Sequence, residues 1–161
     1  VTNLYQPIRP FIRYFSSSRY IDDLANGDIC IAMGYSGDVL QARDRADEAE
    51  NGVKVAYAIP KEGAIRWVDS AAIPKDAKNV AEAHAFLDYL MRPAVIASIS
   101  NYVTYANANQ AATPSVDPEI RNDPGIYPPP AVAAKLIDDT LPSNAEQRPR
   151  VRAWTKIKTG R

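Results

Sequence analysis

In the first third of the chain, segments whose apolar residues have the spacing of a helix alternate with segments that have the pattern of a strand. Residues 19–26 form a short amphipathic pattern that predicts a helix. The run at 29–33 is apolar without polar alternation, which is typical of a strand buried on both faces. A turn over 34–38 leads into a predicted helix over 38–49, and residues 53–59 alternate as a strand does.

The middle of the chain continues this exchange of strands and helices. Residues 65–73 predict another strand. Asn79 begins a strongly amphipathic helix that runs through Leu90, with Glu82 three residues after its cap. Pro93 either ends this helix or begins a second one. The order strand, helix, strand, strand, helix predicts an α/β fold.

Proline interrupts the pattern in the last third of the chain. The segment 113–130 is rich in proline and predicts a compact irregular structure. We expect a helix over about 131–138 and a last helix after Ser143, with Pro149 near its start. The apolar face of that last helix carries Trp154 and Ile157.

The composition is that of a globular protein with no excess charge. Hydrophobic residues make up 46% of the 161 residues, and 19 basic side chains balance 19 acidic ones. A nucleic-acid-binding domain would normally carry a basic excess, so we expect no nucleic-acid partner. No stretch approaches the length of a membrane span, about 20 apolar residues. The first residues show no charged start and no apolar signal core, a pattern that a mature secreted protein shares.

Residues that could carry enzyme chemistry are scarce. The only histidine, His84, lies in mid-helix, where a solvated or partly packed side chain is expected. The only cysteine, Cys30, is most simply a small buried side chain in the strand at 29–33. One histidine and one cysteine cannot complete a metal site, and the sequence holds no catalytic motif or phosphate-binding glycine loop. We therefore expect no enzyme, metal or cofactor; the alternative of an enzyme would require a nucleophile or metal site supplied by residues outside this sequence.

Acidic and aromatic side chains, in contrast, stand near the predicted strand ends. Tyr35 and Asp38 occupy the turn between a strand and a helix, where ligands gather in open α/β sheets. Trp67 and Asp69 alternate along a predicted strand and therefore point to one face, and Tyr105 follows in a polar link. Carboxylates accept hydrogen bonds from an organic ammonium, and aromatic faces attract its charge and cover its methylenes. These five residues are the predicted cation site.

Purely structural interpretations of the same residues remain open at this point. Asp38 can cap a helix, Trp67 can fill a core, and Tyr105 can pack against a loop.

Five segments of the chain resemble the polyamine-binding proteins of bacterial ABC importers, and among them the putrescine-binding members. These segments are YIDDLANGDIC at 20–30, IPKEGA at 59–64, YANAN at 105–109, PGIYPP at 124–129 and RAWTKIKTG at 152–160. The resemblance extends through essentially the whole chain. It implies a periplasmic-binding-protein type II fold, in which two α/β lobes close on a ligand, and this chain would supply its C-terminal half.

The resemblance also implies a division of the chain between the two lobes. Residues 1–58 would form the first part of the second lobe, and residues 59–110 would form strands and helices of the first lobe, with hinge crossings at both ends. Residues 111–161 would complete the second lobe. The N-terminal half of the fold is expected as a separate segment or chain, because an incomplete first-lobe sheet would leave bare edges.

The resemblance gives the five candidate residues their expected ligand-binding roles. Asp38 and Asp69 match the acids at the two ends of the family's cleft, and Tyr105 matches the hinge tyrosine. Tyr35 stands where the putrescine-binding members have Trp, and Trp67 where they have Phe. These exchanges leave the amine open among putrescine, spermidine, agmatine and other cations.

The expected partners follow from the same resemblance. They are a small cationic amine, the missing half of the fold and an ABC permease in the membrane, and the expected location is the periplasm. Cys30 matches a cysteine that forms a disulfide with the upstream half. The alternative function is a ligand-sensing or engineered biosensor module that uses the same cleft.

Overall fold

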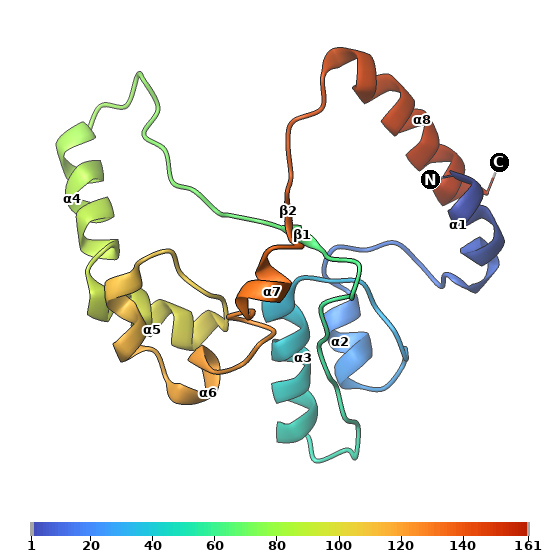
Figure 1. Cartoon of the computed structure of the whole chain (residues 1–161), viewed down its shortest axis with the longest axis horizontal. Coiled ribbons are helices and arrows are strands. Elements are labelled where there is room, and N and C mark those ends of the chain that lie inside the picture. Colours follow the sequence, from blue (N-terminus) through green and yellow to red (C-terminus); the bar gives the residue numbers. More distant parts are fainter. Residues whose placement is uncertain (1, 161) are drawn as a thin grey trace. The chain divides into compact units, whose positions relative to one another are not determined.

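The computed structural model describes residues 2–160 and is dominated by helices (Figure 1). The chain divides into two compact units. The terminal unit joins residues 2–19 to residues 139–160, and the central unit comprises Tyr20–Asp138.

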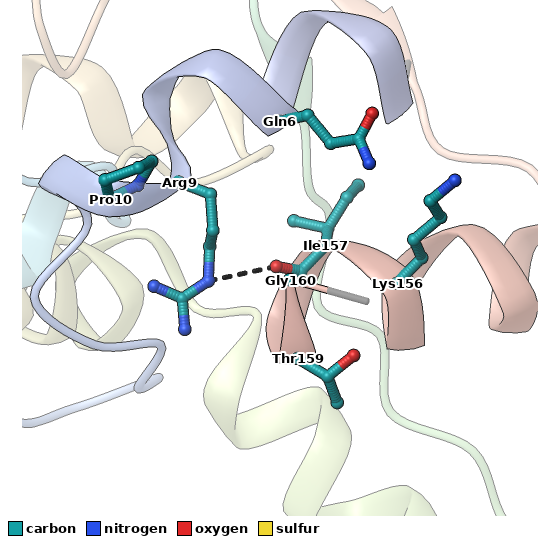
Figure 2. A pocket seen from close by; sticks show the side chains of 7 residues that line it. All are labelled: Gln6, Arg9, Pro10, Lys156, Ile157, Thr159 and Gly160. Atoms are coloured by element: carbon teal, nitrogen blue, oxygen red, sulfur yellow. Dashed lines mark hydrogen bonds between the residues drawn. The ribbon is translucent and has the colours of Figure 1, made fainter.

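In the terminal unit, helix α1 (Thr2–Ile8) packs against helix α8 (Asn144–Thr159). A 3-10 helix, η1 (Arg9–Phe11), follows α1. The Nε atom of Arg9 donates to the carbonyl of Ile157 at 3.0 Å (Figure 2). Its Nη2 donates to the carbonyl of Lys158 at 2.8 Å. A guanidinium there satisfies carbonyls that a helix end leaves without partners and opposes the negative end of the helix dipole.

The start of α8 confirms the predicted helix after Ser143. The backbone N–H and hydroxyl of Ser143 both donate to Glu146 Oε2, at 2.9 and 2.7 Å, and complete a capping box. These hydrogen bonds lower the pKa of the Glu146 carboxyl below its ordinary value. Pro149 lies inside the helix, and Ile157 is buried in the terminal unit as its predicted place on the apolar face requires.

The core of the central unit lies between helices α2 (Tyr20–Ala25) and α3 (Ser36–Glu48). Figure 1 shows the two helices side by side. Small residues three and four positions apart form one face of α3, which lets α2 approach closely. Both helices confirm the sequence prediction, although α3 begins two residues before the expected start. The buried side chains of this α2/α3 cluster are Tyr20, Leu24, Ala25, Val39, Ala42 and Ala46.

The strands predicted at 29–33 and 53–59 are wrong for the described chain. Residues 53–59 alternate in burial as a strand does, with every second side chain against the α2/α3 cluster. Residues 29–33 do not alternate, and Ile29 and Ala32, three positions apart, pack against the same cluster. A strand also needs a neighbour for its hydrogen-bond ladder, and within residues 2–160 neither segment has one. The run at 29–33 is therefore not buried on both faces, since Ile31 and Met33 are 91% and 89% exposed. Cys30 is exposed and unbonded, which corrects its expected burial.

The sheet in the described residues is one parallel pair, β1 (Ile65–Arg66) beside β2 (Ile137–Asp138). The predicted strand over 65–73 is thus limited to its first two residues. The predicted helix over 131–138 is limited to its first turn, because α7 (Pro130–Ala133) ends early and the chain then pairs with β1. Pairing with a distant segment leaves no periodic signal in the sequence, whereas the helical pattern is local. The described residues thus combine helices with one short parallel pair, and the predicted two-lobe α/β architecture stays a prediction.

Helix α4 (Val80–Leu90) confirms the predicted amphipathic helix. Its apolar face is only partly covered, and Phe86 remains 59% exposed. Pro93 begins a second helix, α5 (Pro93–Val103), which settles the two alternatives for this proline. Within the described chain, no helix is both long enough and apolar enough to cross a membrane.

The proline-rich segment is more regular than its composition predicts. It contains the 3-10 helix η2 (Gln110–Ser115) and helix α6 (Pro118–Arg121). Proline is well tolerated in the first turn of a helix because its missing N–H would have no partner there. Pro118 begins α6 in this way, and Pro130 begins α7. A second buried cluster, formed by Ala97, Ala112 and Val116, holds η2 against α5.

Candidate functional site

Tyr35 and Asp38 lie at the N-terminus of α3. Tyr35 is the residue that precedes the helix, and its side chain makes no capping hydrogen bond. Asp38 lies in the first turn, where the positive end of the helix dipole stabilises a carboxylate. The structural alternative in which Asp38 caps the helix is therefore wrong.

The Asp38 carboxylate accepts hydrogen bonds from two tyrosines. The hydroxyl of Tyr20 in α2 donates to Oδ2 at 2.6 Å, and the hydroxyl of Tyr105, after α5, donates to Oδ1 at 3.3 Å. Segments far apart in the sequence thus meet at one carboxylate. The structure brings together three of the predicted residues, Tyr35, Asp38 and Tyr105, and adds Tyr20.

Both tyrosines remain hydrogen-bond donors at neutral pH. Burial raises the pKa of Tyr20 above its ordinary value, and the hydrogen bond to Asp38 raises it further. Burial, followed by the negative charge of Asp38, raises the pKa of Tyr105 to about 12. Ionisation of either phenol would place a second negative charge beside the carboxylate. The carboxylate is consequently surrounded by neutral donors.

Two glycines let the tyrosines reach Asp38. A Cβ atom at Gly34 would overlap the ring of Tyr20, and one at Gly37 would overlap the ring of Tyr105. Only glycine permits the backbone of the 34–38 turn to approach both rings so closely.

Trp67 and Asp69 form a second, separate group on the segment that follows β1. The indole N–H of Trp67 donates to Asp69 Oδ1 at 2.9 Å, so the two side chains share one side as predicted. They lie outside regular strand structure, and Trp67 is 59% exposed rather than part of a core. Within residues 2–160 no hydrogen bond or ion pair joins this group to Asp38. Beside it, Arg66 donates to both oxygens of Asp138, at 2.7 and 2.8 Å.

Sequence reasoning missed Tyr20 as part of the site. Its place at the start of a short amphipathic helix marks it only as a core residue, and it is indeed 4% exposed. The available signal was the pair Gly34 and Gly37, because glycines on both sides of Tyr35 indicate that bulky groups approach the turn.

A pocket of about 250 Å³ lies elsewhere, between α1 and α8 in the terminal unit (Figure 2). None of the predicted site residues lines it, and its Arg9 side chain is engaged by the end of α8. In the described part of the chain, no three His, Cys, Asp or Glu side chains gather as metal ligands. The residues that line the pocket between α1 and α8 are Gln6, Arg9, Pro10, Lys156, Ile157, Thr159 and Gly160.

Known proteins resemble this chain along almost its whole length. It is 58% identical over 160 residues to the putrescine-binding periplasmic protein PotF of Escherichia coli, a match that covers 99% of this chain and 43% of PotF. It is 54% identical over 159 residues to the putrescine-binding periplasmic protein SpuD of Pseudomonas aeruginosa, a match that covers 98% of this chain and 43% of SpuD. A putrescine/agmatine-binding protein of the same species is 44% identical over 154 residues, a match that covers 95% of this chain and 42% of that protein.

The chain thus spans less than half the length of these relatives. The comparisons confirm the resemblance to polyamine-binding proteins that the sequence segments indicate. Residues 1–128 also match the profile of the bacterial extracellular solute-binding proteins. The chain belongs to the bacterial extracellular solute-binding protein family.

Proposed function

We propose that this chain is the C-terminal half of a periplasmic receptor that captures a diamine or polyamine cation. The complete receptor closes two lobes on the amine and delivers it to an ABC permease, and it catalyses no reaction. The observation that carries the proposal is the Asp38 carboxylate, which neutral hydroxyl donors orient at a helix N-terminus. The names of the relatives, which are putrescine-binding proteins of the periplasm, support the same class of ligand.

The chemistry of the five candidate residues suits an amine with an apolar chain. Asp38 and Asp69 offer carboxylate oxygens to ammonium groups at the two ends of the ligand. Tyr35, Trp67 and Tyr105 are each more than one-third exposed, and aromatic side chains at such positions suit contact with methylenes and positive charge. A ligand that bridges Asp38 and Asp69 would hold the two groups together in the closed protein.

The division between two lobes is part of this proposal. Residues 1–58 and 111–161 belong to the second lobe, and residues 59–110 belong to the first. Large exposed apolar side chains, such as Ile31, Met33 and Phe86, support the presence of further chain that covers them in the complete fold. The match to less than half of each relative supports the same view.

Calorimetric titration of the complete two-lobe protein tests the proposed function. Putrescine, cadaverine, spermidine and agmatine serve as ligands, and a neutral diol of the length of putrescine serves as the control. We expect at least one amine to bind with a Kd well below about 1 mM, which corresponds to about −4 kcal/mol. The proposal fails if no amine binds more tightly than this limit, or if the diol binds as well as the amines.

A further inference from the structure

We propose that Tyr20 is a positioning residue for amine binding, which acts through Asp38 and does not touch the ligand. Its hydroxyl holds Asp38 Oδ2 in both the free and the bound protein. The hydroxyl of Tyr105, in contrast, leaves Oδ1 when an ammonium group arrives. This assignment rests on the proposed amine-binding function and gives the two tyrosines different roles within it.

The surroundings of Tyr20 fix its hydroxyl. The side chain is 4% exposed within the α2/α3 cluster, and its ring lies against Gly34. The hydroxyl oxygen accepts the backbone N–H of Tyr35 at 3.1 Å while its proton goes to Asp38. A hydroxyl that is used as both donor and acceptor has little freedom to rotate. The packed Tyr20 side chain therefore restricts the orientation of the Asp38 carboxylate.

Tyr105 holds the other oxygen more loosely. Its side chain is 37% exposed, and its hydroxyl lies 3.3 Å from Oδ1, compared with 2.6 Å for Tyr20 and Oδ2. Hydrogen bonds between hydroxyls and oxygen acceptors are usually about 2.5–3.0 Å long. The longer hydrogen bond from Tyr105 to Asp38 Oδ1 is therefore weak. An ammonium N–H forms a stronger, charge-assisted bond with a carboxylate and can replace it.

The Asp38 charge has no cationic partner in the described chain. None of the ion pairs between residues 2–160 involves Asp38, although both of its oxygens accept hydrogen bonds. Neutral donors orient the carboxylate and leave its negative charge for a ligand. A preorganised acceptor binds more tightly because less freedom is lost on binding. Removal of the Tyr20 hydroxyl should therefore weaken amine binding even though the ligand never contacts it.

Titration of the complete two-lobe protein with putrescine provides the first test, with Tyr20→Phe compared to Tyr57→Phe. Both tyrosines belong to or pack against the α2/α3 cluster, but the Tyr57 hydroxyl has no hydrogen bond within residues 2–160. We expect Tyr20→Phe to raise Kd about tenfold, equivalent to about 1.4 kcal/mol, and Tyr57→Phe to leave Kd unchanged. Equal effects of the two variants on Kd would overturn the positioning role.

A double-mutant cycle separates positioning from a general loss of packing. In the Asp38→Asn background the charged acceptor is gone, so Tyr20→Phe should change the putrescine Kd by no more than about twofold. An undiminished tenfold effect there would show that Tyr20 acts by another route. If the wild-type protein itself binds no amine, the proposed function fails, and that outcome is distinct from a failure at Tyr20.

A crystal structure of the wild-type protein with putrescine gives a readout that does not depend on any variant. We expect the Tyr20 hydroxyl to remain on Oδ2 and the Tyr105 hydroxyl to give way to an ammonium nitrogen at Oδ1. An ammonium group that displaces Tyr20 instead would overturn the assignment.

Discussion

Asp38 and Asp69 carry the same chemical group but differ in what holds them in place. Asp38 is partly buried at the start of a 13-residue helix, and both of its oxygens accept hydrogen bonds from residues distant in sequence. Asp69 is exposed on an irregular segment, and its hydrogen-bond partner is Trp67, two positions away. Among residues 2–160, tertiary packing therefore orients Asp38, whereas a local contact orients Asp69. The difference predicts unequal contributions to binding.

Neutralising the two acids in turn tests this comparison most strongly. Asp38→Asn should weaken putrescine binding by about 100-fold, because it removes an oriented charge at the helix N-terminus. Asp69→Asn should weaken binding by only about tenfold, because an exposed ion pair contributes less. Calorimetry on the complete protein measures both values. A larger loss for Asp69→Asn would reverse the proposed ranking.

The glycine beside Asp38 allows a second test. In Gly37→Ala the new Cβ atom would overlap the ring of Tyr105, and overpacking of this kind typically costs about 1–3 kcal/mol. We expect a lower unfolding temperature and severalfold weaker putrescine binding. Thermal unfolding followed by circular dichroism measures the first effect.

The Tyr105→Ala background serves as the control for Gly37→Ala, because the overlapping ring is absent there. The extra loss of stability should then disappear. If Gly37→Ala destabilises both backgrounds equally, the overlap with Tyr105 is not its cause.

We expect the smallest change in putrescine affinity from a substitution at the exposed pair Trp67 and Asp69. Trp67→Phe keeps an aromatic face but removes the indole N–H that donates to Asp69. An exposed hydrogen bond contributes little, so putrescine affinity should change by about threefold or less. Titration under the conditions used for the acid variants permits direct comparison. A change as large as that of Asp38→Asn would mean that local contacts organise the site as strongly as the core does.

Local signals in the sequence predicted α2, α3, α4 and α8, and left the start of α5 as one of two alternatives. The cap at Ser143 and the apolar period of α4 depend on residues within one or two turns, and both helices are present. The predictions of strands at 29–33 and 53–59 were wrong because a strand requires a hydrogen-bonded partner, which can be distant in sequence. The alternation predicted for 53–59 is nevertheless present in its burial, because every second side chain packs on the adjacent helices.

The candidate site, like the fold, was predictable only in part. The structure joins Asp38 and Tyr105 by a hydrogen bond, and the ligand-binding roles that the family resemblance implies for them stay a prediction. Trp67 and Asp69 share one side because alternate residues of an extended chain do so. Tyr20 was not predictable as a site residue, because its role depends on the distance between two helices rather than on its neighbours in sequence.

The bidentate contact between Arg66 and Asp138 has a consequence for folding kinetics. It joins residues 72 positions apart, where β1 pairs with β2. Closing so long a loop carries a large entropy loss before any contact compensates for it. The α2/α3 cluster, built from nearby segments, should therefore form early, and the β1–β2 pair should form late. Weakening this pair would then speed unfolding while leaving the rate of folding almost unchanged.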